Sequence, residues 1–346
     1  MSKLHRTKSI IAGCIAAWAL VACGGGGGSS NNNTVGTGND TGAPVGTGTG
    51  NGSGTGTGNG GTGGGSSGGF SGQDASAPTL TNNIATDGRN WLNYRRAQIG
   101  MAALTQNAII DKAAQGHSDY QRINNTITHV QTSGKQGFTG ATLEDRLKNA
   151  GYVFAGSNAI GEVISATSNQ NGFYMAEELI TAIYHRFVIF EPVFREIGTG
   201  SGATSSGYAY FTANFVTNDG FGTGLTGNTI GIWPVNGQTG VPVNFYSDNE
   251  EPDPVPDANI VGYPVSVHVN LTHTLTVQSF TIRARNGSAN LQTRLLVKGQ
   301  DPNTTTSSAA AIVPLSPLAA ATTYDVSFIG AIDGNAVSKT WSFTTK

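Results

Sequence analysis

The most restrictive feature of the sequence is the stretch 24–70, which consists almost entirely of Gly, Thr, Asn and Ser, with Asp40 as its only charged residue. Burial of apolar surface normally offsets the entropy that a chain loses on ordering. This stretch has almost no apolar surface to bury, so we expect it to stay disordered. It has neither the lysine nor the strand-to-helix junction of a phosphate-binding glycine loop. We therefore predict a Gly-rich tether over 23–76, with a root-mean-square reach of roughly 40 Å.

The first residues indicate export. Lys3, Arg6 and Lys8 precede an apolar run over 10–20. This run is shorter than the roughly 20 residues of a membrane-spanning helix and is typical of a signal peptide. It ends in Leu-Val-Ala-Cys-Gly, which resembles the lipobox of bacterial lipoproteins, so we predict a signal peptide over 1–22 and acylation of Cys23. The alternative is an ordinary cleavage site followed by a chance cysteine.

The predicted cleavage also bears on partners and location. Cys14 would be removed, so no disulfide could form within the mature chain. The 19 basic residues would fall to 16 against 21 acidic ones, a net charge of −5. No basic cluster remains, so we do not expect a nucleic-acid partner. By resemblance to Gram-negative lipoproteins, an aspartate directly after the cysteine would retain the protein in the inner membrane, and this chain has Gly24 there. We therefore expect the outer membrane, on either of its faces. The lipid anchor would be the contact with the membrane.

Beyond residue 77 the composition becomes globular, and about 270 residues are more than one core usually holds. Helical patterns mixed with short strands precede residue 220, and only strand-length runs follow it. The Gly-rich segment 219–228 is the expected joint. We therefore predict an α+β domain over 77–220 and an all-β domain over 225–346.

In the first body, helical spacing of apolar residues predicts four helices. Two further segments are predicted to be strands. In the second of them, Ala209, Phe211, Ala213 and Phe215 alternate with polar residues, as in a strand with one buried face. The predicted helices are 87–99, 107–123, 143–150 and 175–190, and the predicted strands are 161–165 and 208–216.

Three residues of this body suggest a site. His117 and His185 lie on different predicted helices, and Glu162 lies on a strand expected between them. A single histidine on an apolar helix face is more often a core residue, so the prediction depends on all three together. Two imidazoles and a carboxylate around an open position suit zinc or another divalent metal, and they also suit acid/base chemistry without metal.

The residues resemble those of CAP domains, in the bacterial SCP-like form. This family comprises relatives of cysteine-rich secretory proteins, insect antigen 5 and plant pathogenesis-related proteins. The resemblance covers roughly 140 residues and depends on the order and spacing of its pieces. These are residues 90–95 (NWLNYR), 100–104 (GMAAL), 113–118 (AAQGHS), Thr128-His129, Arg146 to Gly151-Tyr152, Gly161-Glu162, Tyr184-His185-Arg186, 197–200 (IGTG) and 210–215 (YFTANF).

The resemblance implies an α-β-α sandwich with a cleft that holds two histidines and two acidic residues. His117, Glu162 and His185 take three of these positions. Glu178, or its neighbour Glu177, is the candidate for the fourth. The tryptophan that usually marks this helix is absent, and Leu179 stands nearby, so the sequence departs from the family pattern here. His129 matches a histidine of bacterial members and would line the rim or lie on the surface. Val163 departs from the usual Asn after Gly-Glu, which weakens the case for catalysis.

The family is mostly described as secreted binding proteins for sterols, lipids, divalent metals or protein partners. No nucleophile elbow and no H-E-x-x-H motif is present. We therefore favour a membrane-anchored protein that binds a small ligand, a lipid, a metal or an envelope component. One alternative is a metal-dependent hydrolase of peptides or cell wall, with His117 and His185 as ligands and Glu162 as ligand or base. A structural or adhesive lipoprotein is the other.

The second body shows seven strand-like runs separated by turn residues, as in a β-sandwich. Its final residues resemble bacterial Ig-like modules, so we predict an Ig-like domain that acts as a spacer or in adhesion. The acidic segment 248–257 could bind calcium, but a solvated proline-rich loop is the preferred interpretation. His268 and His273 are expected at the surface. The seven runs are 229–233, 241–246, 265–269, 275–284, 293–298, 324–331 and 338–345.

Overall fold

The computed structural model describes residues 70–225 and 229–346, together with the backbone of 10–14. Cys23 and residues 24–69 of the predicted tether lie outside the described residues, so they stay predictions. Residues 70–76 are described, and they contact the folded part instead of belonging to a disordered tether: Ser71 donates to the Thr239 carbonyl at 3.0 Å, and its own carbonyl accepts from Arg95 at 2.8 Å. Within the part that is described, no helix is both long and apolar enough to span a membrane.

Helix caps set the start of the first three helices. The Asn83 side chain accepts a hydrogen bond from the Thr86 backbone N–H, and the Asn107 side chain accepts one from Ile109, so α1 and α2 begin directly after these two asparagines. Thr142 and Asp145 form a capping box before the third helix, which ends at Gly151 with a φ of 107°. These helices confirm three predictions to within three residues at each end: α1 Ile84–Gln98, α2 Ala108–Asn124 and α3 Leu143–Ala150.

The predicted helix over 175–190 is wrong in one respect, because the chain forms two helices there. α4 spans Gly172–Thr181 and α5 spans Ile183–Ile189. Ala182 between them is extended, with a ψ of 123°. This break leaves the first backbone N–H groups of α5 without partners in the helix. They donate to the carboxylate of Glu250, which belongs to the second body. The expectation of a solvated loop over 248–257 is wrong at this residue, because its side chain is fully buried.

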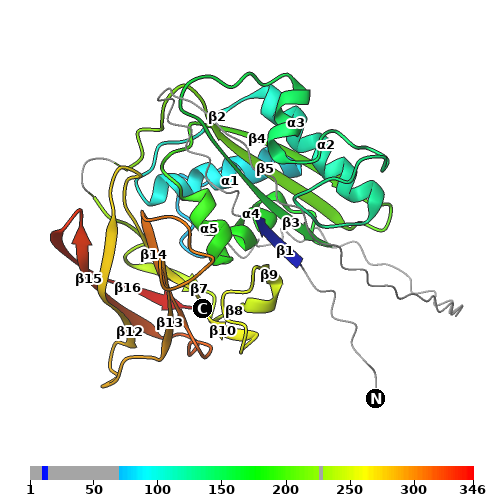
Figure 1. Cartoon of the computed structure of the whole chain (residues 1–346). Coiled ribbons are helices and arrows are strands. Elements are labelled where there is room, and N and C mark those ends of the chain that lie inside the picture. Colours follow the sequence, from blue (N-terminus) through cyan, green and yellow to red (C-terminus); the bar gives the residue numbers. More distant parts are fainter. Residues whose placement is uncertain (1–9, 15–69, 226–228) are drawn as a thin grey trace, which may run out of the picture. The chain divides into compact units, whose positions relative to one another are not determined.

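The central sheet has the strand order β2-β4-β5-β3-β1-β9 (Figure 1). β3 pairs antiparallel with β5 along its whole length, and β5 pairs in the same way with β4. The segment 10–14, part of the predicted signal peptide, forms β1 beside β3 and β9. The strands are β1 Ile10–Cys14, β2 Thr105–Gln106, β3 Ala159–Thr167, β4 Glu196–Ala203, β5 Ala209–Thr217 and β9 Glu250–Glu251.

Helices cover both faces of this sheet. On one face α2 bonds to the strands, because Ser118 donates to the Gly200 carbonyl and shares a hydrogen bond with Thr212. On the other face Gly88 of α1 lies against Phe211. The prediction of a half-buried β5 is therefore wrong: every residue of β5 is buried, since α2 also covers its polar face.

β4 was not among the predicted strands, because its sequence, Glu-Ile-Gly-Thr-Gly-Ser-Gly-Ala, has the composition of a loop. The glycines have a packing role. A Cβ on Gly198 would lie 2.2 Å from backbone atoms of Ile110 and Asp111, and a Cβ on Gly200 would lie 2.2 Å from the Gln115 nitrogen. Helix α2 packs directly on this strand, and only glycine permits that approach.

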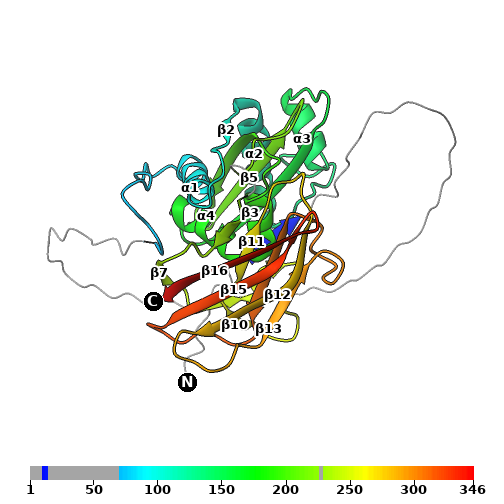
Figure 2. The same cartoon turned by 90° about the vertical axis from the view of Figure 1, so that its left-hand side faces the viewer.

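The second body is all-β and contains several sheets, as predicted in outline. Figure 2 shows β12, β15 and β16 side by side in one of the two four-stranded sheets. The Ala-rich strand β14, central in the other sheet, was not predicted. The Ig-like assignment stays a prediction. The strands are β6 Gly231–Trp233, β7 Gln238–Val241, β8 Asn244–Tyr246, β10 Ile260–Gly262, β11 Val265–His268, β12 Leu275–Ala284, β13 Thr293–Val297, β14 Ala309–Pro314, β15 Thr323–Ile332 and β16 Asn335–Thr345.

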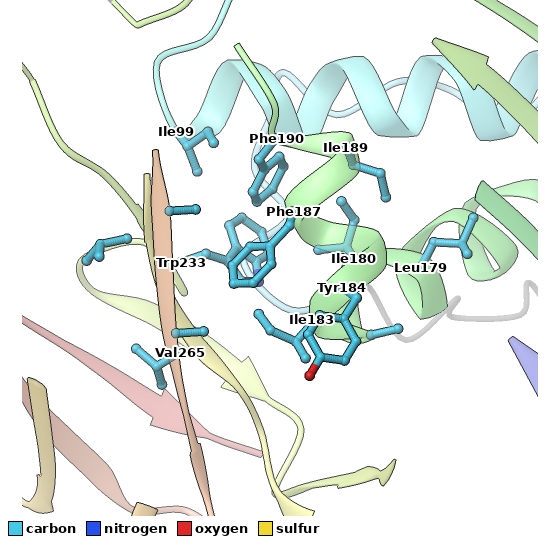
Figure 3. Packing of buried hydrophobic residues seen from close by; sticks show 14 of the residues in the cluster. Ile99, Leu179, Ile180, Ile183, Tyr184, Phe187, Ile189, Phe190, Trp233 and Val265 are labelled. Carbon is cyan, nitrogen blue, oxygen red and sulfur yellow. The ribbon is translucent and has the colours of Figure 1, made fainter. Parts of the chain in front are cut away.

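The two bodies share one hydrophobic cluster, and residues 70–346 fall into one compact unit. Figure 3 shows Phe187 and Phe190 of the α5 region directed toward Trp233 and Val265 of the second body. His268 lies in the same contact, with its ring centroid 5.3 Å from that of Phe190, and it is only 1% exposed. The prediction of a surface histidine is wrong here, because α5 covers it.

Candidate functional site

Glu162 lies on the face of β3 that α2 covers, and three basic side chains surround its carboxylate. Arg146 of α3 donates to Oε2 at 2.6 Å, and His129 Nδ1 lies 2.9 Å from Oε1. His117 Nε2 of α2 is 3.8 Å from the same Oε1. The structure thus brings together three of the predicted residues, His117, His129 and Glu162, and adds Arg146.

Hydrogen bonds fix the tautomer of His117. The Thr139 backbone N–H donates to Gln131 Oε1 at 2.6 Å, which turns the Gln131 amide nitrogen toward His117 Nδ1 at 3.0 Å. Nδ1 is therefore an acceptor, and the ring hydrogen sits on Nε2. Nε2 in turn donates to the Thr128 carbonyl at 2.7 Å. Both ring nitrogens of His117 are engaged.

Burial and charge move the titration of the two groups in opposite ways. Burial lowers the pKa of His117 to about 4, so the ring is neutral at pH 7. Burial alone would raise the pKa of Glu162, but Arg146 and the neighbouring histidines outweigh it and hold that pKa below its usual range. Glu162 is consequently a buried carboxylate that stays ionised and paired.

The cluster also holds polar atoms without partners among the described residues. Asn214 is the cross-strand partner of Glu162, so their Cβ atoms are about 5 Å apart. Both side-chain atoms of the Asn214 amide are buried and unpaired, and so is Arg146 Nε. Buried polar groups in folded proteins nearly always have a hydrogen-bond partner, either protein or water. The His129 side chain, 11% exposed, is the edge of the cluster nearest to solvent.

The structure places the other predicted residues elsewhere. His185 of α5 belongs to the opposite face of the sheet, where its Nδ1 lies 2.9 Å from Glu250. In the described part of the chain no hydrogen bond or ion pair joins His185 to Glu162. Glu177 accepts from the Trp91 indole and from Arg95. Burial raises the pKa of Glu178 to about 7, and a hydrogen bond with Tyr174 opposes this rise.

The donor set around Glu162 does not fit a metal ion in this arrangement. Nε2 of His117 carries a hydrogen, and the carboxylate is already paired with Arg146, whose positive charge would repel a cation. Within residues 70–225 and 229–346 no group of three His, Cys, Asp or Glu side chains is arranged to hold a metal. Zinc or another divalent metal at His117, Glu162 and His185 stays a prediction, and binding there would require these hydrogen bonds to open.

Sequence reasoning did not select Gln131 and Arg146 as site residues. Arg146 carried a usable signal, because it lies three residues after Leu143 and next to Leu147 on the apolar side of a short helix. A buried arginine needs hydrogen-bond acceptors, and an acidic side chain is the partner that best balances its charge. Gln131 carried none, since it lies in an irregular segment.

Comparison with known proteins identifies the first body. Residues 90–215 match CAP, the cysteine-rich secretory protein family. This part of the chain is a CAP domain. The match includes His117, His129, Arg146, Glu162 and His185, and it ends before the second body. No curated protein matches the chain.

Two solved structures are similar to part of the chain. An extracellular protein containing a SCP domain from Bacillus anthracis str. Ames is 22% identical, with a TM-score of 0.34, over 40% of this chain and 41% of that one. The chain thus spans less than half the length of that protein. An outer surface protein from Borrelia burgdorferi is 15% identical, with a TM-score of 0.32, over 38% of this chain and 89% of that one.

Proposed function

We propose that this chain is a lipid-anchored binding protein of the cell envelope, whose CAP domain binds a polar group of an envelope component beside Glu162. The anchor is Cys23, and the tether over 23–69 extends the CAP domain from the outer membrane. Anchoring raises the local concentration of the domain near envelope components, so modest affinity is sufficient.

The observation that carries this proposal is a set of buried polar atoms without hydrogen-bond partners, which lie beside the ion pair of Arg146 and Glu162. Asn214 offers an amide donor and acceptor, and Arg146 Nε offers a further donor, all buried next to Glu162. A ligand group with hydroxyl or amide functions can satisfy them. A full charge is disfavoured, since Arg146 already balances Glu162.

The same geometry favours binding over hydrolysis. A general base works best with a pKa near the operating pH. The pKa of Glu162 is held far below that by Arg146, and His117 uses both of its nitrogens in hydrogen bonds. Neither group is poised to activate water, so the hydrolase is the weaker candidate. In the second body an Ig-like fold is our working assignment.

A soluble muropeptide, which carries hydroxyl and amide groups, is the probe for this proposal. Native mass spectrometry of the mature chain, residues 23–346, should detect a one-to-one complex without cleavage products. His129→Ala removes the ring that contacts the Glu162 carboxylate at the solvent edge of the cluster and should weaken binding at least tenfold. Glu144→Gln changes an exposed carboxylate paired with Lys148 and is the matched control. Cleavage of the muropeptide by the wild-type chain, lost in Glu162→Gln, would favour the hydrolase instead.

The anchor has its own test. Cells that express the chain are labelled with an alkyne fatty acid, and the membranes are then fractionated. The wild-type chain should carry label and sediment with the outer membrane, whereas Cys23→Ser should be unlabelled and soluble after export. Equal labelling of both chains would refute the assignment of Cys23.

A further inference from the structure

The outer face of one sheet in the second body carries two rows of polar side chains. The strands β12, β15 and β16 lie side by side in this sheet (Figure 2). Within a row, neighbouring side chains are about 5 Å apart, and the two rows are about 7 Å apart along the strands. Cross-strand pairing places Thr281, Ser327 and Thr340 in one row and Arg283, Asp325 and Ser342 in the next.

The opposite face of the same strands belongs to the hydrophobic core. Val326 and Trp341, a cross-strand pair that lies between the two rows in sequence, are 2% and 4% exposed. Because side chains alternate along a strand, the residues of both rows face away from this core. Each of them is partly or fully exposed.

The polar face is hollowed. Asn236 lies at one side of the two rows, and Arg285 and Asn290, which follow β12, line the same hollow, whose volume is about 540 Å³. Ligand pockets in proteins typically have volumes of about 300–1,000 Å³. We call this part of the second body the polar hollow.

The charged groups of the polar hollow leave one positive charge in excess. Arg285 donates to Asp325 Oδ1 from Nε at 3.1 Å and from Nη2 at 2.8 Å, so these two charges balance. Arg283 is exposed, and in the described part of the chain it has no hydrogen bond or ion pair. A guanidinium group can hold both oxygens of a carboxylate at once. Arg283 therefore favours a ligand with one negative charge.

The uncharged groups indicate what else such a ligand carries. The side-chain hydroxyls of Thr281, Ser327 and Thr340 have no hydrogen-bond partner within the described residues. A hydroxyl both donates and accepts hydrogen bonds, and an asparagine amide does the same. The hydroxyls of a sugar match both roles, whereas a simple anion only accepts and would leave the acceptors of the polar hollow unused.

We propose that the polar hollow is a binding site for an acidic saccharide. The sugar carboxylate pairs with Arg283, and the sugar hydroxyls bond to the side chains of the two rows. This inference goes beyond the proposed function, because no residue of the polar hollow lies in the CAP domain. The second body is then a binding module with its own ligand and not only a spacer.

Cellobiouronic acid, which has one carboxylate, and cellobiose, its uncharged counterpart, are the probes. NMR of the nitrogen-15-labelled mature chain should show that cellobiouronic acid shifts backbone amide signals of β12, β15 and β16. Cellobiose should bind roughly tenfold more weakly, because it lacks the hydrogen bond between charged groups. Arg283→Gln should remove this difference between the two sugars.

Two further variants separate hydroxyl recognition from general charge attraction. Thr340→Val keeps the shape of the side chain without its hydroxyl and should weaken the binding of both sugars. Lys339→Gln removes a positive charge from the same strand outside the polar hollow, and it should change neither affinity. The amide spectrum of each variant shows directly that it is folded.

The absence of shifts in these three strands at millimolar cellobiouronic acid would overturn the proposal. Equal affinities of the wild-type chain for the two sugars would also overturn it. Inorganic phosphate that competes as strongly as cellobiouronic acid would reveal a site for anions in general and would contradict the saccharide. The proposed function is tested separately at His129 of the CAP domain, so its failure would leave these results unchanged.

Discussion

At the scale of single residues, Glu162 shows how a buried charge is retained. Its carboxylate meets Arg146 at 2.6 Å and His129 at 2.9 Å, with 3% of its side chain exposed. Such a pair contributes little net stability over an apolar pair, yet removal of one member leaves the other charge uncompensated. The cluster therefore ties α3 and the segment around residue 129 to β3.

Glu162→Gln should lower the free energy of unfolding by about 3–5 kcal/mol, because Arg146 would remain buried without its carboxylate. Equilibrium unfolding in urea measures this difference. Glu144→Gln, whose exposed pair with Lys148 contributes at most about 1 kcal/mol, is the comparison. Equal losses in the two variants would contradict the role assigned to the buried pair.

Glu178 provides a pH-dependent prediction. Burial raises its pKa to about 7, so between pH 4.5 and 7 the unfolded state ionises while the folded state stays protonated. The wild-type chain therefore loses stability as pH rises through this window. Glu178→Gln lacks this effect, so its stability relative to wild type should increase by on the order of 2–3 kcal/mol from pH 4.5 to 7.5. Parallel pH profiles of the unfolding free energy would rule this out.

At the scale of elements, β4 and α2 depend on one another. Gly198→Ala places a Cβ 2.2 Å from the α2 backbone, which cannot move aside as a flexible side chain can. The expected loss is about 1–3 kcal/mol or more. Gly202→Ala on the same strand meets only side-chain atoms, those of Arg122 at 3.1 Å and of Asp119 at 3.4 Å, and should be tolerated. Thermal unfolding of the two variants, compared with wild type, measures the difference.

At the scale of the whole molecule, the shared core predicts that the two bodies unfold together. Calorimetry of the mature chain should give one transition with equal calorimetric and van't Hoff enthalpies. Trp233→Ala removes a side chain of the second body that packs on Phe190 and Arg95. This substitution should lower the free energy of unfolding by about 3–5 kcal/mol, and the single transition should move to lower temperature as a whole. Two resolved transitions, of which Trp233→Ala shifts only the one that belongs to the second body, would show that the two bodies unfold independently.

Local pattern explains what could be predicted. Three helices follow from caps and from apolar residues three and four positions apart, and these signals act within one turn. Alternation predicted β5 for the same reason, the predicted strand over 161–165 lies within β3, and the family motifs located the CAP domain. From the sequence, His117, Glu162 and His185 were expected to converge, with His129 at the rim or on the surface. The structure brings His117 and His129 to Glu162 but not His185.

Contacts between distant segments decided the rest. The glycines of β4 signal a loop locally, and only the approach of α2 makes them strand residues. His185 and Glu250 are 65 residues apart, so no local pattern connects them. The sequence by itself determined the CAP domain, three of its helices, and His117, His129 and Glu162 of its candidate site. Tertiary structure decided their partners, because the hydrogen bonds that orient a buried side chain come from whichever segments pack against it.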